Sequence, residues 1–158
     1  MIIEYNQKYD NEVKRLLVQL QEYIVGIDQE KYNIVTPLYG EKYLKQTLEE
    51  IEKCHGKMYL YQEDEQLYGL VVAVIDNDPI TTYDFIAPKR GRITELIVDQ
   101  NIRGKGIGQK LLAKAEDYLY NLDCEAILIG VFAYNDQAIN FYSKNNYHNR
   151  LVDMIKAK

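Results

Sequence analysis

The chain has 158 residues, of which 47% are hydrophobic and 27% are charged, as is ordinary for a soluble globular protein. This length suits one domain with a buried core, and we expect a single domain spanning residues 1–158. The formal net charge of -5 argues against a general nucleic-acid-binding protein, whose contact surface is basic. No segment approaches the length of an apolar transmembrane helix, so no membrane partner is expected.

The cysteines and histidines do not suggest a metal site. The two cysteines, Cys54 and Cys124, and the two histidines lack the spacing of zinc ligands, and a disulfide framework is not expected. Residues 1–10 lack the basic and apolar regions of a signal peptide. We therefore expect a cytoplasmic protein that holds no metal.

The first half of the chain predicts a strand, two amphipathic helices and a β-hairpin. Apolar residues recur at helical spacing in two segments, and Gly26 is a natural stop for the first. Two later apolar runs, separated by a charged turn, are typical of hairpin strands. The expected elements are a strand at residues 1–4, helices at 9–25 and 41–53, and strands at 57–62 and 66–75.

The second half predicts strands that alternate with helices, which indicates a mixed α/β sheet. The sequence AILIGVF at residues 126–132 is continuously apolar, as in a strand of a sheet covered on both faces. The long connection at residues 76–91 is a candidate wall for an acceptor substrate, because long loops in compact domains are often functional. The other expected elements are a strand at 92–98, a helix from 107 to about 121, a short helix from Asn135 to about 145, and one or two strands within 147–156.

Residues 101–119, NIRGKGIGQKLLAKAEDYL, place three glycines between a strand and a helix. Glycines allow a tight turn and a close approach of the backbone to a ligand. The free N–H groups of the following helical turn favour an anion. The expected pyrophosphate cradle therefore combines these glycines with two basic residues: Gly104, Gly106, Gly108, Arg103 and Lys105.

The spacing of the glycines fits neither of two common nucleotide loops. A P-loop needs a glycine five positions before Gly104 and Ser or Thr after Lys105, and this chain has neither. A dinucleotide fingerprint counted from Gly104 needs a glycine where Gln109 stands. A nucleotide-phosphate binder is therefore disfavoured, and a turn of glycines without a ligand is the other alternative.

The loop resembles the coenzyme A loop of the GNAT superfamily of N-acetyltransferases, whose pattern is Arg/Gln-x-x-Gly-x-Gly/Ala. Arg103, Gly106 and Gly108 match this pattern. The segment NDQAINFYSKNNY is similar to the second signature of the family, and the order of elements extends the resemblance over essentially the whole chain. Where the family usually has Gly-Phe, this chain has Asn146-Tyr147, and Asn also tolerates a positive φ.

The resemblance implies a GNAT-like α/β (α+β) fold, with a mixed, mostly antiparallel central sheet and helices on both faces. The parallel strands 92–98 and 126–132 would splay apart, and acetyl-CoA would bind between them as co-substrate. Its pantetheine arm would pair with the backbone of Leu96 and Val98, while Asn135 would bind it from the other side or act only as a helix N-cap. The implied coenzyme-binding residues are Leu96, Ile97, Val98, Arg103, Gly104, Lys105, Gly106, Ile107, Gly108, Asn135 and Tyr142.

The implied chemistry is attack of a neutral amine on the thioester, so an amine with a pKa near about 10.4 must lose a proton. Glu95 is the candidate base, because it is a lone charge among apolar neighbours on a strand expected to be central; an ion-paired or solvated residue is the alternative. A backbone N–H at Leu96 or Ile97 would stabilise the oxyanion. Tyr142 corresponds to the tyrosine that protonates the leaving thiolate, with packing as its alternative role.

The sequence therefore predicts an N-acetyltransferase that moves the acetyl group of acetyl-CoA to a primary amine of a small molecule or peptide. The alternative is a non-catalytic acyl-CoA-binding sensor or interaction module, and the presence of both Glu95 and Tyr142 favours catalysis. The resemblance is also compatible with a homodimer. No motif indicates which amine is the acceptor.

Overall fold

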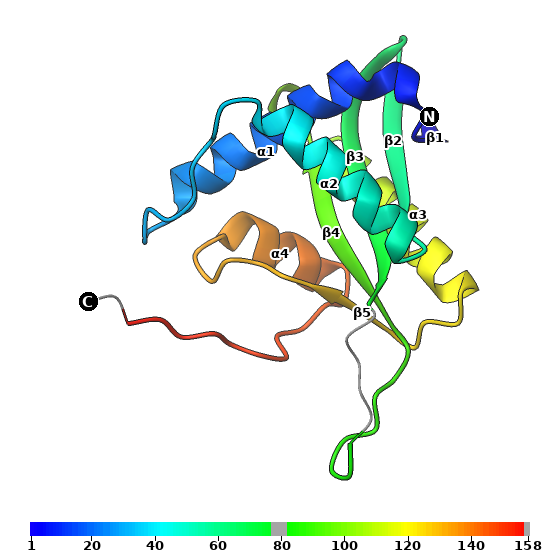
Figure 1. The fold of residues 1–158 in the computed structure, drawn as a ribbon, viewed down its shortest axis with the longest axis vertical. Helices are drawn as coiled ribbons and strands as arrows, with labels where there is room; N and C mark the ends of the chain where they lie inside the picture. Colours follow the sequence, from blue (N-terminus) through cyan, green and yellow to red (C-terminus); the bar gives the residue numbers. More distant parts are fainter. Residues whose placement is uncertain (77–81, 157–158) are drawn as a thin grey trace.

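The computed structural model describes residues 1–76 and 82–156, and these form a five-stranded sheet with helices on both faces (Figure 1). The strand order is β1-β2-β3-β4-β5. The first four strands pair antiparallel, whereas β4 and β5 are parallel, which confirms the predicted mixed sheet. The strands are β1 (Ile2–Glu4), β2 (Lys57–Glu63), β3 (Gln66–Asp76), β4 (Arg90–Val98) and β5 (Ala126–Ile129).

All four predicted helices are present. They are α1 (Asp10–Ile27), α2 (Tyr39–Lys53), α3 (Ile107–Asn121) and α4 (Asp136–Lys144), with 3-10 turns at Gln7–Tyr9 and Gln100–Ile102. Gly26, which was predicted to end the first helix, lies inside its last turn. A glycine weakens a helix without breaking it, and the turn closes when the N–H of Asp28 donates to Ile24 O at 2.9 Å.

Each face of the sheet carries its own hydrophobic core. In Figure 1, α1 and α2 lie in front of the sheet and α3 lies behind it. Residues of β3 alternate between the two cores, so this central strand is buried on both faces. The front core includes Val13, Leu16, Leu17, Leu44, Leu70 and Val72, and the rear core includes Val71, Ala73, Ile93, Leu111, Leu112 and Leu119.

The parallel strands β4 and β5 separate as predicted. Their pairing runs from Arg90 opposite Ala126 to Ile93 opposite Ile129 and stops there. β4 continues through Val98, paired only with β3 within the described part of the chain. A length of β4 therefore faces an opening on its β5 side.

Two predictions for the C-terminal third are wrong. The strand predicted at 126–132 ends at Ile129, because the splay leaves the next residues without a partner strand. Residues 147–156, predicted to supply one or two strands, form neither strand nor helix and run away from the sheet beneath α4 (Figure 1). A strand exists through hydrogen bonds to a neighbouring strand, and this segment pairs with none in the described chain.

Candidate active site

A cavity of about 520 Å³ lies where β4 and β5 separate. This volume is within the range of pockets that hold small-molecule ligands. Its walls are α1, residues 93–98 of β4, most of the glycine loop (residues 103–108), residues 129–132 and α4. The opening between the two parallel strands is thus the centre of the site.

The cavity brings together nearly all the residues that the sequence nominated. Lys105 is exposed and does not line it. The nominated residues that line it are Glu95, Leu96, Ile97, Val98, Arg103, Gly104, Gly106, Ile107, Gly108, Asn135 and Tyr142. Nominated residues from three separate stretches of sequence therefore line one cavity.

Gly104 and Gly106 are needed for the conformation of the loop. Their φ angles are 84° and 75°, in the left-handed region that side chains with a Cβ rarely adopt. Gly106 is the N-cap of α3 and has no side chain to cap it, and the first turn contains no acidic residue. The first N–H groups of this 15-residue helix are consequently directed at the loop, as an anion site requires.

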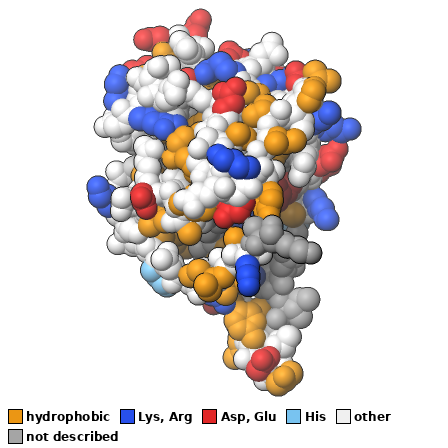
Figure 2. Space-filling view, turned by 90° about the vertical axis from the view of Figure 1, so that its left-hand side faces the viewer, with side chains coloured by type: hydrophobic (Ala, Val, Ile, Leu, Met, Phe, Trp, Pro, Cys, Tyr) orange, Lys and Arg blue, Asp and Glu red, His pale blue; other side chains and the backbone are white. Residues whose placement is uncertain are grey.

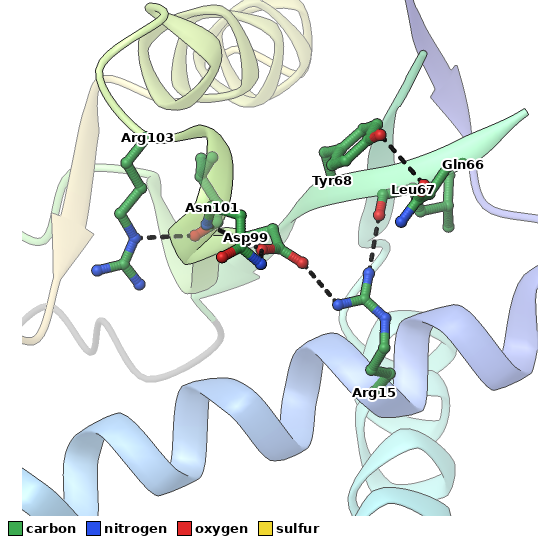
Figure 3. A network of polar contacts seen from close by, with 8 residues as sticks. Arg15, Gln66, Leu67, Tyr68, Asp99, Asn101 and Arg103 are labelled. Atoms are coloured by element: carbon green, nitrogen blue, oxygen red, sulfur yellow. Dashed lines mark hydrogen bonds and ion pairs between the residues drawn. The ribbon is translucent and has the colours of Figure 1, made fainter. Parts of the chain in front are cut away.

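Arg103 is held over the end of β4. Its Nε donates to Val98 O at 3.0 Å (Figure 3). Its guanidinium carbon lies 5.6 Å from the centre of the Tyr23 ring. Both contacts leave the charge at the cavity wall.

An ion pair fixes the entrance to the glycine loop (Figure 3). The Arg15 guanidinium donates to Asp99 Oδ2 at 2.7 Å and to Leu67 O at 2.9 Å, and Asp99 Oδ1 accepts from the N–H of Asn101 at 3.1 Å. Burial acts to raise the pKa of Asp99, but the hydrogen bonds from Asn101 and Arg15 and the positive charge of Arg15 outweigh it and lower the pKa. The pair therefore ties α1 to the turn that precedes the loop.

A one-residue irregularity in β4 determines where Glu95 points. Val72 of β3 pairs with Glu95 and Ala73 pairs with Ile93, so Thr94 has no partner residue. The extra residue shifts the alternation of side chains by one position. Ile93 lies in the rear core, whereas Glu95 accepts a hydrogen bond from Tyr43 on the front helix α2.

Glu95 is buried, with 8% of its surface exposed, and burial raises its pKa to about 7. The charge of Glu50 also raises this pKa, while the hydrogen bond from Tyr43 lowers it. A carboxylate with a pKa near neutrality exchanges protons readily at physiological pH.

Tyr142 lies on α4, in the same cavity as Glu95. Burial and the charge of Glu95 raise its pKa to about 12, so its hydroxyl is protonated at neutral pH. Its ring contacts Phe141 and Tyr147 edge to face, at centroid distances of 5.1 and 5.7 Å. Tyr142 is thus held at the cavity wall by its ring contacts and carries a protonated hydroxyl.

Asn135 has the N-cap role that the sequence left as an alternative. Its Oδ1 accepts from the N–H of Ala138 at 3.2 Å and from the Tyr23 hydroxyl at 3.0 Å. Within residues 1–76 and 82–156 its side-chain nitrogen donates no hydrogen bond, and Asn135 is among the residues that line the cavity. Capping and ligand binding are therefore compatible at this residue.

Residues 22–147 match the model of the Acetyltransferase (GNAT) family. The chain belongs to the GNAT acetyltransferase family. The match includes β4, the glycine loop and α4, so the whole cavity except part of α1 lies inside it. Acetyl transfer is accordingly the reaction class of this GNAT protein, and the predicted family is confirmed.

Solved structures show the same fold. A mutant of the BH1408 protein from Bacillus halodurans is 20% identical, with a TM-score of 0.86 over 100% of this chain and 99% of that one. A glucosamine-6-phosphate N-acetyltransferase from Arabidopsis thaliana is 17% identical, with a TM-score of 0.69 over 99% and 97%. An aminoglycoside N-acetyltransferase in complex with CoA is 14% identical, with a TM-score of 0.76 over 100% and 93%. A comparison with curated proteins gave no match.

Sequence reasoning missed two tyrosines of the N-terminal helices that contact residues of the GNAT cavity. Tyr23 of α1 lines it and contacts both Asn135 and Arg103, and Tyr43 of α2 bonds to Glu95. In sequence both read as apolar positions of amphipathic helices. Nothing in their spacing relates them to residues that lie far along the chain.

The connection between β3 and β4 is not a wall of the GNAT cavity as far as it is described. Residues 82–89 project from the end of the sheet, and none of them lines the cavity (Figure 1). The remaining part of the predicted acceptor wall, residues 77–81, lies outside the described residues.

Within the described chain, no helix is long and apolar enough to cross a membrane.

Proposed function

We propose that this GNAT protein transfers the acetyl group of acetyl-CoA to a primary amine of a small molecule or peptide by direct attack. The observation that carries the proposal is the sharing of one cavity by a carboxylate with a pKa near 7, a protonated tyrosine and a glycine-rich helix start. These are the three groups that the reaction needs: a base, an acid and a diphosphate site.

The glycine loop suits the diphosphate of the coenzyme. A Cβ at Gly104 or Gly106 would project into open space, with no atom within 4 Å, where it would narrow the cradle. The N–H groups at the start of α3 would donate to the phosphate oxygens. Arg103 would turn from Val98 O to the diphosphate, and this carbonyl would then be free to pair with the pantetheine arm beside Leu96.

Glu95 would act as the base, directly or through a water. An amine with a pKa near about 10.4 is mostly protonated at neutral pH. Burial has raised the pKa of Glu95 from 4.5 to about 7, which brings it closer to that of the amine and makes the carboxylate a better proton acceptor. Because Glu95 faces α2, we expect the acceptor to bind on the side of α1 and α2, where Leu20, Tyr23 and Ile24 line the cavity.

The backbone of β4 and Tyr142 would stabilise the charges that develop during the transfer. Successive N–H groups of a strand point to opposite sides, so either Leu96 or Ile97 presents its N–H to the opening beside β4. That N–H would donate to the oxyanion of the tetrahedral intermediate. The Tyr142 hydroxyl would give its proton to the coenzyme thiolate as it leaves.

An acceptor screen tests this function. Thiol release from acetyl-CoA is measured with a panel of polyamines, aminoglycosides, amino acids and peptide N-termini, and turnover is expected with at least one class. Tight binding of acetyl-CoA without turnover of any amine would contradict the proposal and support a coenzyme sensor.

A further inference from the structure

Two arginines and an aspartate form a charged cluster at the end of β3 and the start of β4. Nη2 of Arg90 lies 2.8 Å from Oδ2 of Asp76, and Nη2 of Arg92 donates to Oδ1 of Asp76 at 3.2 Å. Asp76 is buried, so its negative charge needs a partner inside the protein. Because two positive charges face one negative charge, the cluster keeps one positive charge in surplus.

Arg92 is the accessible member of this cluster. Its side chain is 38% exposed, compared with 13% for Arg90 and 3% for Asp76. Within residues 1–76 and 82–156, the Arg92 guanidinium makes one hydrogen bond, to Asp76. A guanidinium has five N–H donors. Most of the donors of Arg92 are therefore unused in this part of the chain and are available to an anionic ligand.

Arg92 and Glu95 project from the same face of the sheet. Arg92 is paired with Val74 of β3 and Glu95 with Val72, and both valines belong to the front core. Residues directly opposite each other on antiparallel strands share a face. Two positions along β3 span about 7 Å. The surplus positive charge and the proposed base are therefore separated by about the length of a small molecule.

Thr94 lies between these two residues on β4 and carries an unsatisfied hydroxyl. Its Oγ1 is buried and has no hydrogen-bond partner within the described chain, and the residue lines the cavity. A buried polar group without a partner is costly to the folded protein. Arg92 itself does not line the cavity. The cavity thus extends along β4 from Glu95 to the residue Thr94, two positions from Arg92, and offers a polar contact there.

The charges near the two ends of this stretch have opposite signs. The charge of Glu50 on α2 raises the pKa of Glu95, so a second acidic group lies near the proposed base. Acidic groups attract an amine, whereas Arg92 attracts an anion. On the side of the molecule that Figure 2 shows, the described basic and acidic side chains are interspersed. A charged ligand is then selected by individual side chains near the cavity, since a broad field requires a patch of one sign.

We propose that the acceptor is an amine that also carries a carboxylate or a phosphate, with its amino group at Glu95 and its anionic group bound by Arg92. The planar guanidinium fits both of these anions with paired hydrogen bonds. The ion pair with Asp76 would hold the arginine in position, and the Thr94 hydroxyl would contact the acceptor between its two ends. This inference rests on the proposed N-acetyl transfer and names the class of its substrate.

Matched pairs of amines test the acceptor class. Thiol release from acetyl-CoA is measured with ω-amino acids of increasing length, each against its amide, and with aminoalkyl phosphates, each against the corresponding amino alcohol. At least one anionic amine should have a kcat/KM at least tenfold above that of its neutral counterpart. The two series distinguish a carboxylate from a phosphate as the preferred anion.

Arg92→Gln tests the residue. Asp76 keeps its partner Arg90 in this variant, so the fold should persist, as circular dichroism would show. The kcat/KM for the anionic amine should fall at least tenfold, mainly through KM, while that for the neutral counterpart stays the same. Lys45→Gln is the control, because it removes a positive charge that is 79% exposed on α2, and it should change neither value.

Calorimetry separates this inference from the proposed function. Turnover of anionic and neutral amines at equal rates, or a preference that persists in Arg92→Gln, would overturn the inference and leave N-acetyl transfer standing. If no amine is turned over, binding of the anionic amines to the coenzyme A-loaded protein decides. Binding that weakens at least tenfold in Arg92→Gln would support the anion site without the reaction, and no binding would overturn both.

Discussion

The hydroxyl of Tyr43 on α2 donates a hydrogen bond to Oε1 of Glu95 on β4, joining residues that are 52 positions apart in sequence. Burial raises the pKa of Tyr43, and the charge of Glu95 raises it further, so the phenol is protonated and acts as donor. Tyr39 stacks on the Tyr43 ring at a centroid distance of 5.1 Å and holds it in place. The orientation of the proposed base therefore depends on α2, a helix that the sequence did not connect with the site.

The pH dependence of the reaction reports the state of Glu95. Only its deprotonated form accepts a proton, and its pKa is about 7. We expect kcat/KM to rise with pH below about 7 and to level off above it, after correction for the ionisation of the amine. Glu95→Gln should remove this rise and lower kcat by at least about tenfold with acetyl-CoA affinity little changed. Full activity of this variant would remove Glu95 from the mechanism.

Removing the Tyr43 hydroxyl should move the profile to higher pH. The hydrogen bond stabilises the charged carboxylate and so lowers the pKa of Glu95; without it, burial acts unopposed. Tyr43→Phe should therefore lose more activity at pH 6 than at pH 9. Tyr39→Phe is the control, because the Tyr39 hydroxyl bonds to Gln21 and not to Glu95. A uniform loss at all pH values would show that Tyr43 only supports the packing.

Tyr142→Phe tests the proposed acid. The variant keeps the ring that packs on Phe141 but cannot protonate the thiolate. We expect kcat to fall by at least about tenfold, with coenzyme affinity little changed in calorimetry. Tyr147→Phe removes a neighbouring hydroxyl that bonds to Glu116 outside the cavity, and it should leave kcat close to that of the unmodified protein. An unchanged kcat in Tyr142→Phe would assign this residue to packing alone.

Gly106→Ala tests the diphosphate site. At a φ of 75° an alanine is strained by roughly 1 kcal/mol, and its methyl group would narrow the cradle. The dissociation constant of acetyl-CoA, measured by calorimetry, should rise at least about tenfold. Gly26→Ala is the control, because Gly26 is helical and a Cβ there has no atom within 4 Å. This change should stabilise α1 by about 0.5–1 kcal/mol. Unchanged coenzyme affinity in Gly106→Ala would place the diphosphate elsewhere.

The Arg15–Asp99 pair should contribute to stability in a pH-dependent way. The pKa of Asp99 in the folded protein lies below its ordinary value of 3.8. The contribution of Asp99 to the free energy of unfolding is therefore complete at pH values above 3.8, and it is lost as the pH falls through the folded pKa. Asp99→Asn should lower the free energy of unfolding by about 1–3 kcal/mol at pH 7 and by less near pH 2. Lys45→Ala, which breaks an exposed pair with Glu49, should change it little. Denaturant unfolding at the two pH values provides the comparison.

The sequence by itself determined most of the elements and the family. Helical spacing of apolar residues located three helices and the N-cap Asn135 located the fourth, all to within a few positions. The glycines of the loop indicated an anion site, and two of them, Gly104 and Gly106, have the positive φ that glycine adopts most readily. Asn146 has a φ of 66°, as expected from its place in the second signature. These features depend on local conformation, and local conformation is encoded within a few residues.

Only the tertiary structure decided which side chains meet and which segments pair. The side of the sheet that Glu95 faces depends on the unpaired Thr94, and a bulge is defined by two strands together. Tyr23 and Tyr43 reach the site because of the way α1 and α2 pack. Periodicity identifies the buried face of a helix but not the residues against which that face packs. Residues 147–156 have the apolar pattern of a strand, but a strand needs a partner, and the described chain offers none. Contacts between distant residues are set by the packing of whole elements, and this is why they could not be read from the sequence alone.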